Sequence, residues 1–408
     1  MTFDTDILIA GAGPSGLAAA CAMGAEGHRV VLVDPAPPVT GEDAPGADLR
    51  TTALLQPART MLERAGAWDG LAPRGTALWK MRIVDAATPD PVVRDFDARD
   101  ISDAPFGWNF PNWALRGALL DRASSLDTVD LRFGLSVTAM LRRNAAARVT
   151  LSDGTRLTAR LVVACDGRDS ALRRMADIPV RRVDYGQTAI VFAVAHDRPH
   201  EDVSVEVHRS GGPFTLVPLP DREGEHRSGV VWMDDAAIQQ ARMEMSDADF
   251  AAAANERSAD VLGHLRLVPG RAAWPILSVL AGRFTARRLA LVAEAAHAMP
   301  PIGAQGLNTS LKDIATLRDL AATGEIGSDA MLDAYARARQ ADVALRMAGI
   351  DLLNRSSIAG LVPVQRLRRA GVAAFHDVPP IRRALMHLGL GATETPQGRR
   401  PDVQSAKT

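Results

Sequence analysis

The first 34 residues carry the clearest pattern of apolar and polar segments in the chain. An apolar run, Ile7 to Ala10, precedes a glycine-rich turn, a stretch of small apolar residues that ends near Gly24 and Gly27, and a second apolar run, Val30 to Val33. Short uninterrupted apolar runs are typical of strands that are buried on both faces of a parallel sheet. The pattern therefore predicts strand, turn, helix and strand, closed by Asp34.

The turn between the first strand and the helix has the spacing G-x-G-x-x-G, with Pro14 and Ser15 inside it. Gly11 permits a tight turn, Gly13 lets the backbone approach a pyrophosphate, and Gly16 lets helix and strand pack closely. The N-terminus of the helix offers free N–H groups to such a phosphate. The turn therefore predicts a phosphate-binding site.

Asp34 follows the glycines by about twenty residues, where a carboxylate can accept hydrogen bonds from ribose hydroxyls. The same carboxylate would repel a 2′-phosphate, so NADP is not expected here. The glycines alone are a weak signal, but the strand, the helix and the acid all accompany them. We therefore expect a dinucleotide site, which NAD or FAD could occupy.

Loops, helices and short strands alternate in the next part of the chain. A Pro- and Gly-rich loop, 35–48, leads into an expected helix from Asp48 to Leu62. Arg50 in this helix is either a solvated surface group or a phosphate contact. Further along we expect a hairpin within 77–106, a helix at Trp113 to Leu126 with Arg116 in its first turns, strands at 131–133 and 136–138, and a hairpin of 148–151 with 157–159.

Two further apolar runs end in an acidic residue at a turn. Residues 159–164 read as a buried strand before Asp166-Gly167, with Ser170 and Arg173 opening a helix. Residues 288–293 read as a buried strand before Glu294, followed by a loop rich in Pro and Gly and a helix that starts near Asn308, whose N-terminus would stabilise negative charge. For His297 in this loop, hydrogen bonding that fixes the loop is favoured over a catalytic role.

The segment between these two turns shows a strand pattern. The expected strands are Thr188 to Ala195, Val203 to His208, Phe214 to Pro218 and Gly229 to Met233, before a helix from Ser246 to Leu267. This indicates a mixed sheet inserted between two halves of the nucleotide domain.

The C-terminal part reads as helical from Ser328 onward, with Leu332, Tyr335 and Arg339 on one face. Residues 344–375 mix apolar positions with arginines. Packing on the core is favoured for this segment over contact with a membrane surface or a partner helix. The polar tail after Thr395 is expected to be disordered.

Composition narrows the class of protein. The 408 residues are 47% hydrophobic and carry a net charge of −1, which fits a globular protein and gives no sign of nucleic acid binding. The start has no basic region before its apolar run, and no apolar stretch is long enough to span a membrane, so a cytoplasmic protein is expected. Cys21 and Cys165 read as buried thiols of a reducing compartment, and no metal-ligand spacing is present.

Taken in order, these motifs resemble those of the FAD-dependent aromatic hydroxylases, the group of para-hydroxybenzoate hydroxylase. Within that group the chain is most similar to the ubiquinone-biosynthesis hydroxylases. The similarity lies in the glycine turn, Asp48-Leu49-Arg50-Thr51-Thr52-Ala53-Leu54, Asp166-Gly167, Tyr185-Gly186-Gln187-Thr188-Ala189, Gly212 to Leu219, Pro301-Ile302-Gly303-Ala304-Gln305-Gly306-Leu307-Asn308, and Leu332-x-x-Tyr335-x-x-x-Arg339.

The resemblance implies an α/β fold, in which a Rossmann-like FAD-binding domain holds an inserted mixed β-sheet substrate domain and C-terminal helices follow. The FAD-binding domain would comprise 1–75, 107–182 and 281–326. The substrate domain would comprise the hairpin 76–106 and the sheet 183–280, before a helical region, 327–395, and a flexible tail, 396–408.

The resemblance also implies roles for particular residues. Gly11, Gly13, Pro14, Ser15 and Gly16 would bind the FAD pyrophosphate, Asp34 the adenosine ribose, and Arg50 and Arg116 the phosphate and ribityl region, with Val137 and Asp166 also at the cofactor. Glu294 replaces the aspartate that is usual in the family but keeps its charge. Gly303, Gln305, Gly306, Leu307 and Asn308 would line the isoalloxazine ring. Phe214, Leu216, Pro218, Pro300 and Pro301 would face the substrate, with Pro301 a candidate for positioning its ring.

The implied reaction is hydroxylation of the aromatic ring of a polyprenylated phenol in ubiquinone biosynthesis, through a flavin C4a-hydroperoxide formed with O₂. No acid–base triad is needed, and electrons would come from NAD(P)H or a redox partner. Possible partners are other proteins of a ubiquinone-biosynthesis complex and the inner face of a membrane. The alternatives are a hydroxylase of a small soluble aromatic acid, which the lack of Arg and Lys in 188–195 and 214–218 disfavours, and a non-catalytic flavin-fold subunit.

Overall fold

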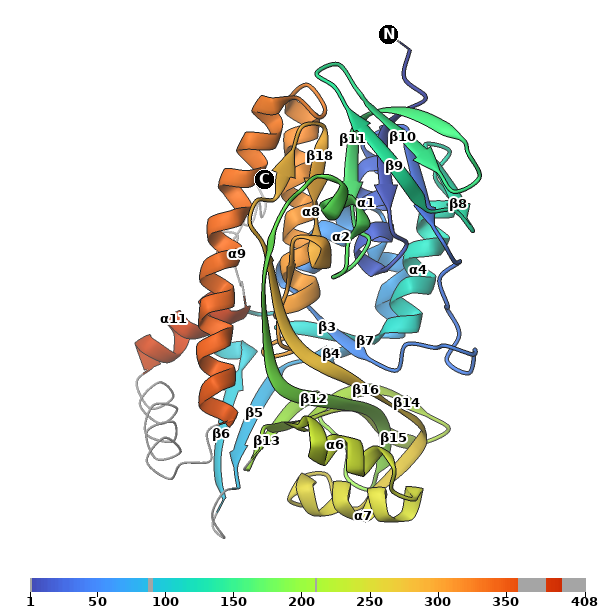
Figure 1. Ribbon diagram of the computed structural model, residues 1–408. Coiled ribbons are helices and arrows are strands. Elements are labelled where there is room, and N and C mark those ends of the chain that lie inside the picture. The colour runs from blue at the N-terminus through green and yellow to red at the C-terminus, as the bar shows by residue number, and fades with distance from the viewer. Residues whose placement is uncertain (1, 87–90, 210, 359–378, 391–408) are drawn as a thin grey trace, which may run out of the picture.

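The computed structural model describes residues 2–86, 91–209, 211–358 and 379–390. Figure 1 shows an upper sheet surrounded by helices, a short sheet in the middle, and a second large sheet below, with two helices beneath it. The expected α/β fold with an inserted mixed sheet is confirmed.

The upper sheet has the strand order β17-β18-β11-β1-β2-β8, with β10 and β9 attached to β11. The pairs β11–β1, β1–β2, β2–β8 and β11–β18 are parallel, so the carboxyl ends of these strands share one edge. The strands are β1 (Thr5–Ala10), β2 (Val30–Asp34), β8 (Val129–Phe133), β9 (Val137–Arg142), β10 (Ala147–Leu151), β11 (Arg156–Ala164), β17 (Thr285–Ala286) and β18 (Leu289–Leu291). The expected hairpin strand at 157–159 and the buried strand at 159–164 are one strand, β11.

The helix α1 (Pro14–Ala25) is buried on nearly every side, because α4 (Asn112–Ser124) and α8 (Gln305–Thr323) both pack against it. Its small apolar residues allow this close packing and explain why it has no polar face. The short α5 (Ala171–Met175) follows β11 after the Asp166-Gly167 turn, and η3 (Ala293–Ala295) follows β18. These connections place both acidic turns at the edge that carries the glycine turn.

The middle sheet corrects one prediction. The helix expected from Asp48 to Leu62 is wrong: residues Thr51–Leu55 form the strand β3, and the helix α2 begins only at Gln56. β3 pairs with β7 (Gly107–Pro111), which also pairs with β4 (Thr76–Leu78), so a partner more than fifty residues away overrides the local helix pattern. The helical segments of this region are α2 (Gln56–Arg64), α3 (Trp68–Leu71), η1 (Ala72–Arg74) and η2 (Ala98–Asp100).

The lower sheet has the order β19-β16-β12-β15-β14-β13-β5-β6. All its neighbours are antiparallel except β5 and β13, so the sheet is mixed and the predicted hairpin joins it as β5–β6. The strands are β5 (Lys80–Asp85), β6 (Val92–Asp97), β12 (Val180–His196), β13 (Val203–His208), β14 (Pro213–Arg222), β15 (Glu225–Asp235), β16 (Leu265–Ala281) and β19 (His297–Ala298).

Two helices, α6 (Ala236–Met243) and α7 (Asp247–Ser258), lie below this sheet in Figure 1. The helix expected from Ser246 to Leu267 is therefore too long, since Ala259 adopts a left-handed conformation (φ 53°) that ends α7. The chain then returns to the sheet as β16, which the sequence did not predict.

The helix α9 (Asp329–Ile358) runs down one side of the molecule, from the upper sheet to the lower one (Figure 1). Leu332, Tyr335 and Arg339 lie on its buried face, as predicted, and are each at most 2% exposed. α11 (Pro379–Leu390) is the last described element, so the predictions for residues 359–378 and for the tail lie outside the described residues.

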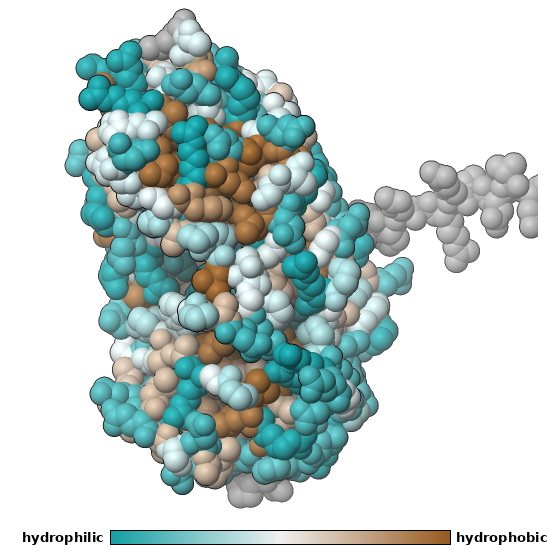
Figure 2. Space-filling view, turned by 90° about the vertical axis from the view of Figure 1, so that its right-hand side faces the viewer, coloured by the Kyte–Doolittle hydropathy of each residue, from teal (hydrophilic) through white to brown (hydrophobic). Residues whose placement is uncertain are grey.

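The face drawn in Figure 2 has apolar side chains gathered mainly in its upper part, with a smaller cluster lower down. Among the described helices none is long and apolar enough to cross a membrane. Cys21 and Cys165 are free thiols, and burial raises the pKa of the Cys21 thiol to about 12, so it is unreactive at neutral pH.

Candidate active site

The glycine turn has the geometry that its sequence predicts. Gly11 has a φ of 107°, and a Cβ on it would collide with the carbonyl oxygen of Cys165. A Cβ on Gly16 would collide with the carbonyl oxygen of Gly11. By contrast, no heavy atom lies within 4 Å of a Cβ built on Gly13. Two glycines are thus required by packing, and the third faces open space that a phosphate could fill.

The start of α1 is open to a ligand at the carboxyl end of β1. No side chain caps the helix, whose first residues are Pro14 and Ser15. Asp34 lies beside it at the end of β2, where its carboxylate accepts hydrogen bonds from the N–H groups of Ala12 (2.6 Å) and Ala36 (2.9 Å). Val137, the first residue of β9, is half-buried against the upper core. The helix dipole and the uncapped N–H groups of the first turn of α1 favour an anion here.

Asp48 is the centre of a cluster of charged and polar side chains that precedes β3. Its side chain is 5% exposed, and Oδ2 accepts hydrogen bonds from Arg50 (2.6 Å), Asn112 (3.0 Å) and Arg116 (3.1 Å). Burial alone would raise the pKa of Asp48, but Arg50, Asn112 and Arg116 outweigh it and hold this pKa below the usual value. The Arg50 guanidinium also lies 4.2 Å from the ring centre of Trp274, on the lower sheet. The cluster thus holds both candidate phosphate arginines on one carboxylate, and Trp274 places Arg50 against the lower sheet.

The Asp166-Gly167 turn has a buried acceptor without a partner. Oδ2 of Asp166 accepts a hydrogen bond from the N–H of Leu172 (3.0 Å), whereas Oδ1 is buried and has no partner among the described residues. Gly167 has a φ of 81° and open space at its Cβ position. Arg173 then donates to the carbonyl oxygen of Ala295 (2.8 Å), which ties this turn to the turn of Glu294.

Glu294 lies in the short helix η3 and its side chain is 47% exposed. The preceding Ala293 is left-handed (φ 57°), so the chain turns sharply after β18. Arg168 of the neighbouring turn lies 3.5 Å from the Glu294 carboxylate. The structure therefore brings both acidic turns together, with Glu294 reaching outward.

The loop before α8 leads directly to the helix N-terminus. Gly303 (φ 63°) and Ala304 (φ 56°) are both left-handed, and no side chain caps the helix that begins at Gln305. Gly306 has open space at its Cβ position. Pro300 is buried, Pro301 is exposed and Leu307 is half-buried. This loop therefore offers backbone N–H groups and space for a flat ligand.

Asn308 joins this loop to the middle sheet. Its Oδ1 accepts a hydrogen bond from the N–H of Leu55 (2.8 Å), and its Nδ2 donates to the carbonyl oxygens of Ala53 (2.7 Å) and Ala304 (2.6 Å). The Gln305 side chain donates to the carbonyl oxygen of Gly303 (2.9 Å). Asn308 thus fixes β3 against α8 instead of pointing freely into the site.

Phe214 and Leu216 are fully buried and belong to the core between the lower sheet and α7. Pro218 is buried too, and its carbonyl oxygen accepts a hydrogen bond from Asn109 of β7 (2.9 Å). The opposite face of β14 turns toward the middle layer, where Val217 packs with Leu55. The structure therefore places Phe214 and Leu216 behind the face that is turned to the cofactor part.

His297 is 2% exposed, and its Nε2 lies 2.6 Å from Oδ2 of Asp313, which is fully buried. This contact supports the interpretation that His297 fixes the loop. A cavity of about 380 Å³ lies elsewhere, at the amino ends of β1 and β2, and is lined by Thr5, Arg29 and Val30 among others. Because ligands of such sheets bind at the carboxyl ends, this cavity is not part of the site.

These features fit FAD. The open positions at Gly13, Gly167 and Gly306, the orphaned oxygen of Asp166 and the uncapped starts of α1 and α8 lie along the loops at the carboxyl ends of β1, β11 and β18. Such a series of sites suits a long, flat molecule with phosphates in its middle. The fold and the site together define a flavin-dependent enzyme.

Comparison with known proteins gives the family. A model of the FAD binding domain matches residues 4–348, and the chain belongs to this family as an FAD-dependent monooxygenase that uses O₂ and a reductant. The chain is 34% identical over 396 residues to the ubiquinone hydroxylase UbiL of Rhodospirillum rubrum, covering 95% of this chain and 89% of that protein. It is 26% identical to the 3-demethoxyubiquinol 3-hydroxylase of Escherichia coli, covering 95% and 98%.

Among solved structures, the p-nitrophenol 4-monooxygenase PnpA of Pseudomonas putida superposes with a TM-score of 0.77 at 20% identity, covering 97% of this chain and 100% of that chain. The shared fold and the relatives confirm the resemblance to the FAD-dependent aromatic hydroxylases. Sequence reasoning missed the roles of Trp274 and Asp313. Neither lies in a glycine or acidic turn, so only their tertiary contacts reveal them.

Proposed function

We propose that this enzyme hydroxylates the aromatic ring of a polyprenylated phenol in ubiquinone biosynthesis. The observation that carries the proposal is the 34% identity to a ubiquinone hydroxylase over 95% of the chain. The Escherichia coli relative, whose name also specifies a ubiquinol ring, supports the same substrate class. Which ring carbon reacts is decided by how the substrate lies on the lower sheet.

The cofactor site comprises sixteen residues in this proposal. Bound FAD supplies the activation of O₂ and the transfer of oxygen. The glycine turn and α1 hold its phosphates, and the backbone N–H groups at the start of α8 stabilise negative charge on its ring. The residues are Gly11, Gly13, Pro14, Ser15, Gly16, Asp34, Arg50, Arg116, Val137, Asp166, Glu294, Gly303, Gln305, Gly306, Leu307 and Asn308. Electrons come from NAD(P)H or a redox partner.

The substrate lies against the face of the lower sheet that is turned to the middle layer. Ala189, Met233 and Ile276 form an apolar cluster there, and Val231 packs against it. Gly229 of the same strand as Val231 and Met233 faces Thr51 of β3, because a Cβ on Gly229 would meet the Thr51 side chain. An apolar wall beside β3 excludes water from the ring and suits a substrate without a carboxylate.

The remaining candidate substrate residues lie around this apolar face of the lower sheet. Phe214, Leu216 and Pro218 support it from behind, and Pro300 and Pro301 bound the ring site from the loop before α8. Pro301 is exposed, so it is free to contact a bound ring.

A peripheral contact with the inner face of a membrane and association with other ubiquinone-biosynthesis proteins complete the proposal. Polyprenyl tails partition into bilayers, and the second half of α9 exposes Leu345 (77%), Leu352 (70%) and Leu353 (57%). Arg355 is exposed in the same half. Exposed leucines beside a cation suit the interface of an anionic bilayer or an apolar partner surface.

Mass spectrometry of quinones and their precursors in cells that lack this gene tests the function. We expect a prenylated phenol short of one hydroxyl to accumulate, and wild type to restore the product. Gly13→Val should fail to restore it, because the added side chain would fill the open space proposed for the FAD phosphates. The protein should still fold, since a Cβ at Gly13 meets no other heavy atom within 4 Å. Gly70→Ala is the matched control, since Gly70 is exposed and its Cβ position is also open. An unchanged quinone profile in a strain without other hydroxylases of this family would reject the proposal.

A further inference from the structure

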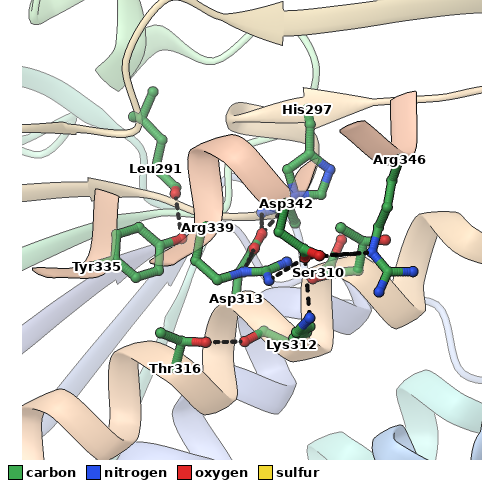
Figure 3. Close-up of polar contacts among 12 residues, drawn as sticks. Leu291, His297, Ser310, Lys312, Asp313, Thr316, Tyr335, Arg339, Asp342 and Arg346 are labelled. Atoms are coloured by element: carbon green, nitrogen blue, oxygen red, sulfur yellow. Dashed lines mark hydrogen bonds and ion pairs between the residues drawn. The ribbon is translucent and has the colours of Figure 1, made fainter. Parts of the chain in front are cut away.

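Asp313 of α8 is a buried carboxylate that lies behind the cofactor loop. It is fully buried and accepts hydrogen bonds from the N–H of Ala293 (3.2 Å), from Nε2 of His297 (2.6 Å) and from Nε of Arg339 (2.7 Å). Figure 3 shows Asp313 between His297 and Arg339. Three donors on one buried carboxylate balance its charge and fix its orientation.

Two of these donors lie on either side of Glu294 in the sequence. Ala293 directly precedes Glu294, and its left-handed conformation (φ 57°) leaves its N–H directed at Asp313. His297 follows the turn and belongs to β19, which pairs with β16. Asp313 therefore holds both ends of the segment 293–297 from one carboxylate.

The third donor comes from α9. Arg339 is 1% exposed and also donates to Asp342 (2.6 Å), and Tyr335 on the same face donates to the carbonyl oxygen of Leu291 (2.9 Å). Figure 3 shows these two α9 side chains reaching toward the strand and the helix that flank the turn. The contacts give a role to the Leu332-x-x-Tyr335-x-x-x-Arg339 pattern, which the cofactor site itself leaves unexplained.

We propose that Asp313 is a positioning residue for the flavin, acting through Ala293 and His297 to set the Glu294 turn against the start of α8. Glu294 and the α8 N-terminus are the two parts of the cofactor site that the carboxylate joins, since Asp313 lies in the third turn of α8. Asp313 and His297 are too deeply buried to touch the substrate, so neither is a catalytic residue. The inference rests on the proposed cofactor site.

The test compares Asp313→Asn with Asp342→Asn in the full-length protein. Asn keeps the shape of Asp313 but removes its charge and directs an amide N–H₂ at one of its donors. Asp342 contacts Arg339, Lys312 and Arg346 at the surface side of the same network, away from the turn. We expect Asp313→Asn to bind FAD about 10- to 100-fold more weakly, with shifted visible absorption bands of the bound flavin, and Asp342→Asn to match wild type in both.

Three measurements separate positioning from general stability: FAD titration by fluorescence, the flavin absorption spectrum, and the rise in Tm caused by FAD. A lowered Tm with wild-type FAD affinity and spectrum would overturn the inference. If Asp313→Asn does not fold, Arg339→Lys keeps the charge but loses the fixed guanidinium geometry, and the same shift in spectrum and affinity is expected. Wild-type affinity and spectrum in that variant would count equally against the inference. Failure of the wild-type protein to bind FAD would instead reject the proposed cofactor site.

Discussion

Replacing Asp48 by Asn should destabilise the protein and loosen both candidate phosphate arginines. Asp48 accepts hydrogen bonds from Nε (2.8 Å) and Nη2 (2.6 Å) of Arg50 and from Nη2 of Arg116 (3.1 Å). The side chains of Arg50 and Arg116 are only 32% and 20% exposed. Asn keeps the volume but leaves two cations without their anion.

The expected loss in the free energy of unfolding is about 2–3 kcal/mol. A hydrogen bond to a charged group contributes roughly 1.5–3 kcal/mol, and breaking a buried ion pair costs about 3–5 kcal/mol. The smaller of these two estimates, the one for a hydrogen bond to a charged group, applies because Arg50 and Arg116 both reach solvent. Urea denaturation of the protein without FAD, followed by circular dichroism, measures the loss directly.

The loss should also depend on pH in a defined direction. Since Arg50, Asn112 and Arg116 hold the folded-state pKa of Asp48 below its usual value, its stabilising effect is fully present above the unfolded pKa of about 3.9 and disappears as pH falls through the folded pKa. The difference between wild type and Asp48→Asn should therefore be constant from about pH 7 to pH 5 and shrink below about pH 4. A difference under about 0.5 kcal/mol at pH 7, or one that grows on acidification, would refute this reasoning.

Three further predictions concern packing and backbone contacts. Gly16→Ala should give insoluble protein, because its Cβ would collide with the carbonyl oxygen of Gly11; soluble expression at the wild-type level would contradict this. Asn308→Ala should lower stability by about 1–3 kcal/mol, since backbone donors and acceptors of β3 lose their partners, and thermal denaturation checks it against Asn144→Ala at an exposed position. Tyr335→Phe should cost about 1 kcal/mol in urea denaturation, because it removes one buried hydrogen bond, and an unchanged midpoint would be inconsistent with that contact.

The parts of the fold that the sequence predicts are those in which neighbouring residues decide the structure. The tight turn at Gly11 and the close packing at Gly16 are predicted correctly, because turn geometry and helix packing are set within about ten residues. β3 and β16 were missed for the opposite reason. The helix pattern after Asp48 yields to pairing with β7, and Pro269 and Gly270 interrupt the pattern of β16, where the pairing with β12 is irregular.

The candidate site was also predicted only where residues close together in the sequence decide the structure. The alternation along β14 correctly groups Phe214 with Leu216 on one face, but alternation does not say which face of a sheet is turned to the cofactor. Asp313 and Trp274 escaped notice because their partners, Arg339 and Arg50, are distant in sequence. A pattern of residue types identifies loops that bind phosphate more readily than side chains that hold those loops in place.

The paired strands β12 and β16 have a consequence for how such enzymes diversify. The chain leaves the upper part along β12 and returns along β16, and Val180 lies directly opposite Ala281 at the upper end of the pair. Residues opposite each other on antiparallel strands are only about 5 Å apart, so the whole intervening segment begins and ends at nearly one point. The segment between Val180 and Ala281 can therefore be exchanged as one unit without moving the strands to which its two ends are joined. The substrate can change from one descendant to the next while the flavin-holding half is inherited intact.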